Sequence, residues 1–397
     1  MSIPQLKDAE VNGKRVIVRV DFNVSLTADK AIANDSRIRA AVPTIHYLLK
    51  QHAKIILLSH LGRPNGEVDP ALTLSGVAKR LSELLAKQVS FVDSYLDPHA
   101  SQAMNALAPG SVVLCENLRF NPGEELNDVA FAKQLSQLGD IFVNDAFGTA
   151  HRAHASTVGI TAFLPSYAGL LFWREISMIG DAVTKPKRPL VVVIGGGKTP
   201  EKIRVIEKLL ETANTIYLGG AIANTFFATW GIGVGVSKVD HEMIEMARNV
   251  LWKATRVPAQ LLLPADVIVS NAERTTKPMV LPYNQVPMGL GIYDIGPCAQ
   301  EELNGIIQKA GTIIWNGPMG LYEDARFAAG TIKTCESIAK SKSVSIVGGG
   351  DTITTITDEQ ALKSIDLIST GGGAMLEFIE KGTLPAIAAL KNGFHSA

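Results

Sequence analysis

The chain has 397 residues, which is too long for one ordinary hydrophobic core and predicts two or three domains. Its 38 basic and 38 acidic side chains cancel, so the overall charge attracts neither nucleic acid nor an anionic membrane. The three cysteines form no CxxC pair, which argues against a disulfide framework and favours a reducing compartment. No apolar run approaches the roughly 20 residues of a membrane helix, and the polar N-terminus does not resemble a signal peptide. We therefore expect a cytoplasmic protein without a membrane or nucleic-acid partner.

In the first half of the chain, short apolar runs alternate with segments of helical period. In one of those segments Ile38, Val42 and Ile45 share a face, as an amphipathic helix requires. The predicted strands lie at 14–24, 54–61, 112–118 and 141–147, and the predicted helices at 36–52, 74–87 and 127–139.

The second half repeats this alternation after a proline-containing boundary, TKPKRP, at 184–189. The chain ends in a short amphipathic segment, 384–394. Strands alternating with helices predict parallel sheets covered on both faces, built from right-handed crossovers. The predicted fold class is therefore α/β, with two doubly wound parallel-sheet domains. The predicted strands of this half lie at 190–195, 215–219, 260–270, 312–317 and 344–348.

Cationic side chains follow the predicted strands of the first half. Each one alone is best interpreted as an ordinary surface residue, and His151 with His154 lacks a third ligand at metal-binding spacing. Together they recur at the carboxyl ends of strands, where open α/β sheets bind ligands. Guanidinium groups match carboxylate and phosphate geometry, so we predict a small, multiply anionic metabolite there. The polar groups at these ends are Asp21 to Asn23, Arg37, His60 to Arg63, Arg119 and Arg152.

Glycine clusters follow the apolar runs of the second half and predict phosphate binding by backbone N–H groups. The cluster at 191–199 is not a P-loop, because Val192 stands where that motif needs glycine. GIGVGV at 231–236 lacks the last glycine of a dinucleotide fingerprint. The cluster at 345–352 adds a carboxylate, Asp351, and a hydroxyl, Thr352, suited to Mg²⁺ and phosphate oxygens.

Taken together, these segments closely resemble the phosphoglycerate kinase family over essentially the whole chain. The matching segments are VRVDFNV (18–24), SRIRAAVPTI (36–45), LLSHLGRP (57–64), ENLRF (116–120), FVNDAFGTAHRAH (142–154), WNGPMGLYE (315–323), VGGGDT (347–352) and STGGGA (369–374). The resemblance implies a domain at 1–172, joined by about 383–397, that binds 3-phosphoglycerate. It implies an interdomain helix and hinge at 173–189 and a nucleotide-binding domain at 190–382.

The resemblance also implies residue roles. The substrate-binding set is Asp21, Phe22, Asn23, Arg37, His60, Leu61, Gly62, Arg63, Arg119 and Arg152. The nucleotide-binding set is Lys202 at the phosphates, Glu323 at the ribose, and Gly349, Gly350, Asp351 and Thr352, with Asp351 at the Mg²⁺ of the nucleotide. Arg37, Lys198, Lys202, Gly372 and Gly373 are implied to support the transferred phosphoryl group. ATP or ADP, 3-phosphoglycerate or 1,3-bisphosphoglycerate, and a monomeric state complete the expectation.

Three segments depart from the family pattern: 172–176, 195–201 and 290–297. None of them removes a charged group that the reaction needs, although the last leaves the adenine pocket wall open. Two other functions remain as alternatives. A non-catalytic anion binder would not need Lys202 or Asp351 beside glycine loops, and the missing fingerprint disfavours an NAD-dependent dehydrogenase.

Overall fold

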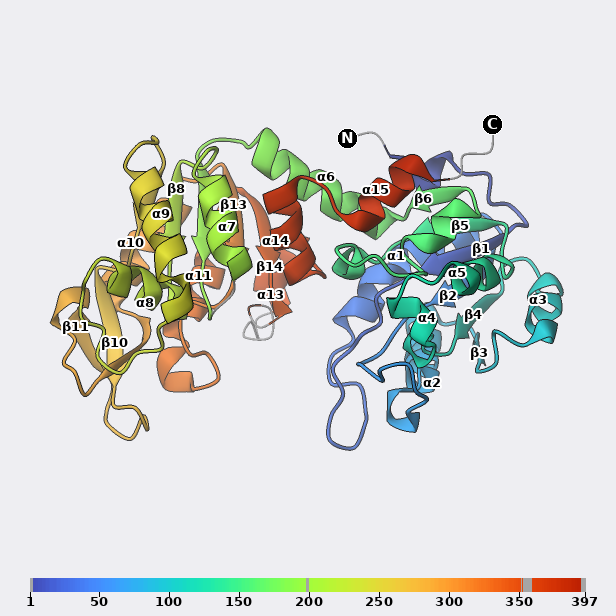
Figure 1. The fold of residues 1–397 in the computed structure, drawn as a ribbon, viewed down its shortest axis with the longest axis horizontal. Coiled ribbons are helices and arrows are strands. Elements are labelled where there is room, and N and C mark those ends of the chain that lie inside the picture. Colours follow the sequence, from blue (N-terminus) through green and yellow to red (C-terminus); the bar gives the residue numbers. More distant parts are fainter. Residues whose placement is uncertain (1–2, 198–199, 351, 353–358, 394–397) are drawn as a thin grey trace. The chain divides into compact units, whose positions relative to one another are not determined.

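The computed structural model describes residues 3–197, 200–350, 352 and 359–393. The chain divides into two compact units (Figure 1). Unit 1 comprises Met1–Ser177 and Thr383–Ala397, and unit 2 comprises Met178–Gly382. Helix α6 (Leu170–Thr184) begins in unit 1 and ends in unit 2.

Unit 1 is built on a six-stranded parallel sheet in the order β3-β4-β2-β1-β5-β6. Its strands are β1 (Arg15–Arg19), β2 (Lys54–Leu58), β3 (Val89–Val92), β4 (Val112–Cys115), β5 (Ile141–Asn144) and β6 (Ser166–Ala168). Its helices besides α6 are α1 (Ser36–Lys50), α2 (Ser75–Leu85), α3 (Pro98–Asn105), α4 (Pro122–Glu125), α5 (Val129–Ser136) and α15 (Pro385–Asn392).

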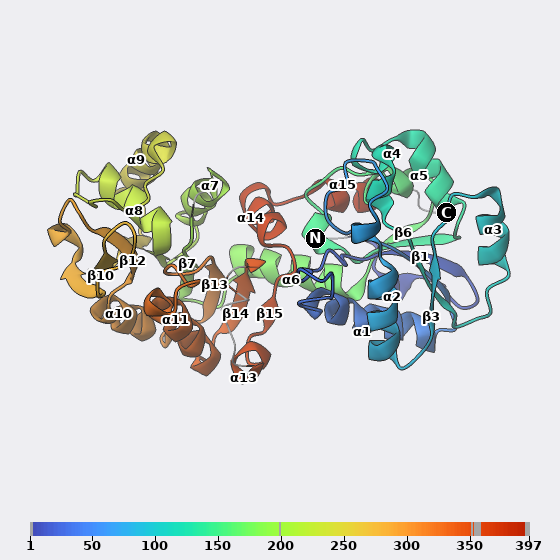
Figure 2. The ribbon, with the colours of Figure 1, turned by 90° about the horizontal axis from the view of Figure 1, so that it is seen from below.

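Alternate residues of each strand in unit 1 enter different cores, because side chains alternate across a sheet. Val16 and Val18 of β1 pack with residues of α1 and α2, whereas Ile17 packs with residues of α3 and α5. Figure 2 shows α1 and α2 on one side of this sheet and α4 and α5 on the other. Both faces are therefore covered, which explains why the strands are continuous apolar runs.

Unit 2 also has a six-stranded parallel sheet, in the order β15-β14-β13-β7-β8-β9. Its strands are β7 (Leu190–Ile194), β8 (Thr215–Leu218), β9 (Gln260–Leu262), β13 (Thr312–Asn316), β14 (Val344–Gly348) and β15 (Leu367–Ile368). The helices are α7 (Pro200–Leu209), α8 (Gly220–Thr229), α9 (Ile244–Ala254), α10 (Pro297–Ile307), α11 (Ala329–Lys340), α13 (Glu359–Lys363) and α14 (Gly372–Lys381). One face packs β7 and β13 against α10, α11 and α13, and Figure 2 shows α7 and α8 on the other side.

A second, antiparallel sheet in unit 2 was not predicted. It has the order β11-β10-β12, with β10 (Asp266–Ser270), β11 (Met279–Pro282) and β12 (Gly291–Ile295). The single strand predicted at 260–270 is wrong, because the chain leaves the parallel sheet after β9 and enters this sheet with β10. Pro264 lies between the two strands, and its missing N–H ends a ladder.

The α/β fold class is confirmed, with two six-stranded parallel sheets. Strands β3 and β6 were not predicted, because one is half exposed and the other has only three residues. Among the described residues, every helix is too short or too polar to cross a lipid bilayer.

Candidate functional site

The arginines at the strand ends of unit 1 converge on His60, which directly follows Ser59 at the end of β2. Its side chain is 3% exposed. Burial lowers the pKa of His60 well below 6.5, and the positive charges of four arginines lower it further. Those arginines are Arg19, Arg119, Arg37 and Arg152. The structure thus brings together three of the predicted substrate arginines, as the topology argument requires.

Arg37 lies in the first turn of α1 and is held by the loop after β1. Its Nη1 donates to the carbonyl oxygen of Asn23 at 2.9 Å and to Asp21 Oδ1 at 3.3 Å. The Asp21 side chain is 6% exposed, and its Oδ2 lies 3.2 Å from Arg37 Nη1. The guanidinium is therefore positioned before any ligand arrives.

Hydrogen bonds join the loops that follow β1, β2 and β4. Gly62 N donates to Asn23 Oδ1 at 2.9 Å, and Arg119 Nη1 donates to the Gly62 carbonyl at 2.6 Å. Arg119 Nη2 also lies 3.0 Å from Glu125 Oε1. These bonds fix the positions of three loops relative to one another.

Not every predicted substrate residue can use its side chain. Phe22 and Leu61 belong to the hydrophobic core of unit 1, so only their backbone atoms remain for a ligand. Arg63 is exposed, and Arg152 Nε lies 3.3 Å from His151 Nε2. His154 is neutral, because burial and the neighbouring arginines lower its pKa to about 3. Among the described residues no group of three or more His, Cys, Asp or Glu side chains could hold a metal ion.

Sequence reasoning missed a buried polar network beneath this cluster. Arg19, Glu124 and Ser156 are all 0% exposed. Arg19 Nε donates to Ser156 Oγ at 2.8 Å, and Ser156 Oγ donates to Glu124 Oε1 at 2.6 Å. The sequence did contain one indication of this network. Arg19 lies inside a strand predicted to be buried on both faces, and a buried charge must have polar partners.

A pocket of about 960 Å³ lies at the strand ends of unit 2. Every predicted nucleotide-binding residue that the structure describes lines it, together with two of the glycines predicted to support the phosphoryl group. Lys198 and Asp351 lie outside the described residues. The predicted residues that line the pocket are Lys202, Glu323, Gly349, Gly350, Thr352, Gly372 and Gly373.

The wall of this pocket is made of backbone segments in close contact. Gly317 has φ +92°, and a Cβ there would lie 2.2 Å from the carbonyl oxygen of Gly195. A Cβ on Gly372 would lie 2.9 Å from the Cα of Gly349. Side chains at these positions would separate the loops, so glycine is required for the wall to form. Lys202 Nζ donates to the Gly195 carbonyl at 2.7 Å and lies at the same junction.

Asn316 and Asp294 are among the polar residues of the pocket that were not predicted. The Asn316 amide nitrogen is buried and finds no hydrogen-bond acceptor among the described residues, so it is available to a ligand. Asp294 is 2% exposed and accepts hydrogen bonds from Ile295 N at 2.9 Å and Gly330 N at 2.8 Å. Burial raises the pKa of Asp294 to about 7. Asn316 ends β13 and Asp294 lies within β12, where one sequence does not distinguish a structural from a ligand-binding polar group.

Thr352 has a structural partner. Its side chain is fully buried, and Oγ1 accepts a hydrogen bond from Gly317 N at 2.9 Å. Tyr293, in a segment that departs from the family pattern, also lines the pocket, and its hydroxyl donates to the Asn271 carbonyl at 3.1 Å. The departing segment therefore contributes Tyr293 to the pocket wall and Ile295 to the core of unit 2.

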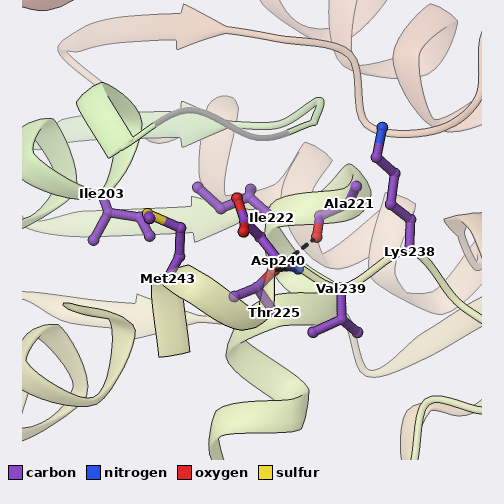
Figure 3. A pocket seen from close by; sticks show the side chains of 8 residues that line it. All are labelled: Ile203, Ala221, Ile222, Thr225, Lys238, Val239, Asp240 and Met243. Carbon is purple, nitrogen blue, oxygen red and sulfur yellow. Dashed lines mark hydrogen bonds between the residues drawn. The ribbon is translucent and has the colours of Figure 1, made fainter. Parts of the chain in front are cut away.

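A much smaller cavity of about 20 Å³ adjoins this pocket (Figure 3). It is too small for a metabolite, and its lining is largely apolar. Figure 3 shows the aliphatic stem of Lys238 beside this cavity, with the ammonium group turned away from Ile203, Ile222 and Met243. Lys238 also lines the large pocket, and its Nζ would lie 3.9 Å from a Cβ on Gly197. Lys202 and Lys238 thus both place an ammonium group near the glycine loop that contains Gly196 and Gly197.

Two parallel-sheet units, one with arginines at its strand ends and one with a glycine-walled pocket that contains a lysine, define an α/β phosphotransferase. A sequence model of phosphoglycerate kinase matches residues 6–382. The phosphoglycerate kinase of Moorella thermoacetica is 46% identical over 97% of this chain and 98% of its own length. That of Akkermansia muciniphila is 47% identical, over 97% of both chains. The chain belongs to the phosphoglycerate kinase family.

Solved structures agree with this assignment. The structure of phosphoglycerate kinase from Coxiella burnetii matches with a TM-score of 0.87 and 39% identity, covering 98% of this chain and 99% of its own. That from Pyrococcus horikoshii matches with a TM-score of 0.85 and 31% identity, covering 98% of both chains. The family and its phosphotransferase activity class are therefore established, and the family of enzymes predicted from the sequence is confirmed.

Proposed function

We propose that this chain transfers a phosphoryl group reversibly between 1,3-bisphosphoglycerate and ADP, giving 3-phosphoglycerate and ATP. The observation that carries the proposal is the pocket of unit 2, which collects every described residue predicted for the nucleotide. The arginine cluster around His60 in unit 1 supplies the complementary anion site. A non-catalytic anion binder has no need of the pocket.

Unit 1, with a predicted domain at 1–172 and about 383–397, binds 3-phosphoglycerate. Arg119, Arg152 and His60 bind its anionic groups, and Asp21 positions Arg37 for the transferred phosphoryl group. Phe22 and Leu61 contribute backbone atoms alone, since their side chains lie in the core. Arg63 is exposed and meets the substrate from the edge of the cluster.

Unit 2, with a predicted domain at 190–382, binds the nucleotide. Lys202 contacts phosphates and Glu323 contacts the ribose, with the glycine loops at 349–350 and 372–373 donating backbone N–H groups. Asp351, which lies outside the described residues, would hold Mg²⁺ together with the phosphate oxygens, because carboxylate and phosphate oxygens are the ligands that Mg²⁺ prefers. When bound, it neutralises charge that develops on the phosphates.

The chemistry needs no general base, because the group that attacks ATP is a carboxylate already ionised at neutral pH. The protein instead positions the two substrates in line and stabilises a loose, metaphosphate-like transition state. Arg37, Lys198 and Lys202 supply positive charge, and Gly372 and Gly373 supply N–H groups. This role for positive charge suits the proposed site, which is made of cationic side chains and backbone N–H groups.

Two substrates on two units require closure before transfer, through the segment around 168–190. Closure excludes water, which would otherwise hydrolyse ATP. We expect the enzyme to act in the cytoplasm as a monomer. Small-angle scattering tests the motion: the radius of gyration should fall when both substrates are present, and an unchanged radius contradicts closure.

A coupled assay with ATP, 3-phosphoglycerate and Mg²⁺ tests the function. We expect turnover by the pure protein, a requirement for Mg²⁺, and loss of most activity in Arg37→Ala and Lys202→Ala. Absence of turnover contradicts the proposal, and so does full activity in both variants.

A further inference from the structure

We propose that a buried chain of hydrogen bonds, from Glu124 through Ser156 and Arg19, fixes His60 as the neutral Nε2–H tautomer. In this form Nε2 of His60 donates a hydrogen bond to the anionic substrate. Arg19, Ser156 and Glu124 are thus positioning residues that act through His60. The tautomer follows from unit 1 alone, and the role toward 3-phosphoglycerate rests on the proposed function.

The hydrogen-bond chain begins at the buried side chain of Glu124, and the guanidinium of Arg19, which has donors alone, sets the direction of its last bond. Glu124 Oε2 accepts from the Ser156 backbone N at 3.0 Å, and Oε1 accepts from Ser156 Oγ at 2.6 Å. The serine proton is therefore committed to Glu124, and the hydroxyl oxygen is left to accept. Arg19 Nε donates to it at 2.8 Å.

Arg19 is the central member, and each edge of its guanidinium has an acceptor. Beyond Ser156, its Nη1 donates to the Val20 carbonyl and its Nη2 lies 3.1 Å from His60 Nδ1. A guanidinium has donors and no acceptor, so Nδ1 must carry its lone pair toward Arg19. A neutral imidazole then has its proton on Nε2.

The surrounding charges keep His60 neutral. Burial lowers its pKa, and Arg19, Arg119, Arg37 and Arg152 lower it further. The acids of the network, Asp21 and Glu124, lie at 7% and 0% exposure, with one paired to Arg37 and the other bonded to Ser156. His154, 3.7 Å from Glu124, is neutral because its own pKa falls to about 3.

The proton on Nε2 is available to a ligand. Among the described residues, His60 makes its one side-chain hydrogen bond through Nδ1 to Arg19. A neutral donor beside several cations attracts a phosphate or carboxylate oxygen without adding repulsion to the arginines. The hydrogen-bond chain therefore makes His60 a donor of fixed direction, and the guanidinium groups supply the positive charge.

Nuclear magnetic resonance of the full chain labelled with ¹⁵N-histidine tests the tautomer directly. The signals of His60 are those that disappear in His60→Gln. We expect the Nε2–H pattern at neutral pH, and it should persist as the pH falls below 6.5, the usual pKa of His. An Nδ1–H pattern, or protonation near pH 6.5, overturns the proposal. This measurement on the unmodified protein stays decisive if a variant fails to fold.

Two serine variants test the hydrogen-bond chain. Ser156→Ala removes the acceptor of Arg19 Nε, so the guanidinium should lose its fixed position beside His60 Nδ1 and His60 should give a mixture of tautomers. KM for 3-phosphoglycerate should rise about five- to tenfold and kcat should change less than about twofold. Ser166→Ala is the matched control, because Ser166 is equally buried and its hydroxyl bonds to the Leu164 carbonyl at 2.7 Å. It should leave the signals and KM unchanged. Equal effects of the two variants would overturn the proposal that the hydrogen-bond chain fixes the His60 tautomer.

Conservative variants of His60 test the direction of donation. The amide nitrogen of Gln overlays Nε2, whereas that of Asn overlays Nδ1, so His60→Gln should bind 3-phosphoglycerate about tenfold more tightly than His60→Asn. The reverse order overturns the proposal. Adding 3-phosphoglycerate should also shift the Nε2 proton, and turnover without such a shift overturns the substrate role alone. An Nε2–H signal in a protein without turnover would contradict the proposed function but support the fixed tautomer of His60.

Discussion

The two candidate sites use different parts of the polypeptide to attract an anion. In unit 1 the charge comes from side chains, which are held by buried partners such as Asp21 and Glu124. In unit 2 the pocket wall comes from backbone, because glycine loops after several strands approach one another more closely than side chains allow. A site made of side chains should lose function when a charge is removed. A site made of backbone should lose it when an atom is added.

The largest expected effect is at the backbone contact of unit 2. Gly317→Val places a Cβ 2.2 Å from the Gly195 carbonyl at a residue with φ +92°. Strain and overpacking together should lower the free energy of unfolding of unit 2 by about 4 kcal/mol. Nucleotide binding should be lost, as measured by calorimetry alongside urea unfolding.

Gly305→Ala is the control for this substitution, because Gly305 lies in α10 with nothing within 4 Å of a Cβ. It should leave nucleotide binding unchanged and stabilise the helix by about 0.5 to 1 kcal/mol. Normal ATP affinity in Gly317→Val would show that the wall tolerates added atoms, and the comparison would fail.

The next largest effect is at a side chain of unit 1. Arg37→Ala removes positive charge from the proposed phosphoryl position and should lower kcat/KM by about 10²-fold or more. The affinity for ATP alone should stay the same, because the proposed nucleotide pocket lies in unit 2.

Arg39→Ala, two residues along the same helix, is the matched control. Arg39 pairs with Asp35 at 2.8 Å but is more than half exposed, so its loss should change neither activity nor, by more than about 0.5 kcal/mol, stability. A fall in ATP affinity in Arg37→Ala would break the separation between the two sites.

Local sequence patterns predicted the parallel sheets and the positions of the site arginines. A strand buried on both faces is a continuous apolar run. Arg119 follows such a run within a few residues, and Arg37 lies in the first turn of the helix that comes after β1. The carboxyl ends of parallel strands share one edge, so topology alone brings these residues together. The same argument placed Lys202 and the glycine loops at one edge of unit 2.

The parts that could not be predicted depend on residues far apart in the chain. Arg19 and Ser156 are separated by 137 positions, and no local period connects them. The antiparallel sheet was missed because β9 and β10 form one largely apolar stretch of sequence, interrupted by Pro264 and Asp266. Lys238 was missed because an exposed lysine in a loop has no pattern that distinguishes it from any other.

A smaller effect concerns stability, and it compares one buried carboxyl in each unit. Asp145 accepts from Leu171 N at 3.0 Å and Phe172 N at 3.1 Å, and Asp294 accepts two backbone bonds in unit 2. Burial raises the pKa of each carboxyl from 3.8 to about 7. Because the folded state then binds the proton more tightly, the stability that each contributes is fully present below pH 3.8 and is lost as the pH rises through 7.

Urea titrations from pH 5 to 7 measure this contribution. The stability of the native chain relative to Asp145→Asn or Asp294→Asn should fall by roughly 1 kcal/mol per pH unit. Similar slopes for the two variants would mean that both units bury a neutral carboxyl. If the stability of the native chain relative to the Asn variants instead rose with pH, the carboxyl groups would be ionised in the folded state, and the sign of the prediction would be wrong.

The smallest effect is at Lys238, a side-chain cation of the unit 2 pocket that the sequence did not indicate. Lys238→Met keeps the aliphatic stem beside Ile222 but removes the ammonium group near Gly197. Because the group is exposed, we expect KM for ATP to rise about three- to tenfold with kcat unchanged. Lys208→Met, whose ammonium pairs with Glu211 at 2.7 Å on the surface of α7, should leave KM unchanged. A hundredfold rise in Lys238→Met would mean that side-chain charge, and not backbone, dominates in both sites.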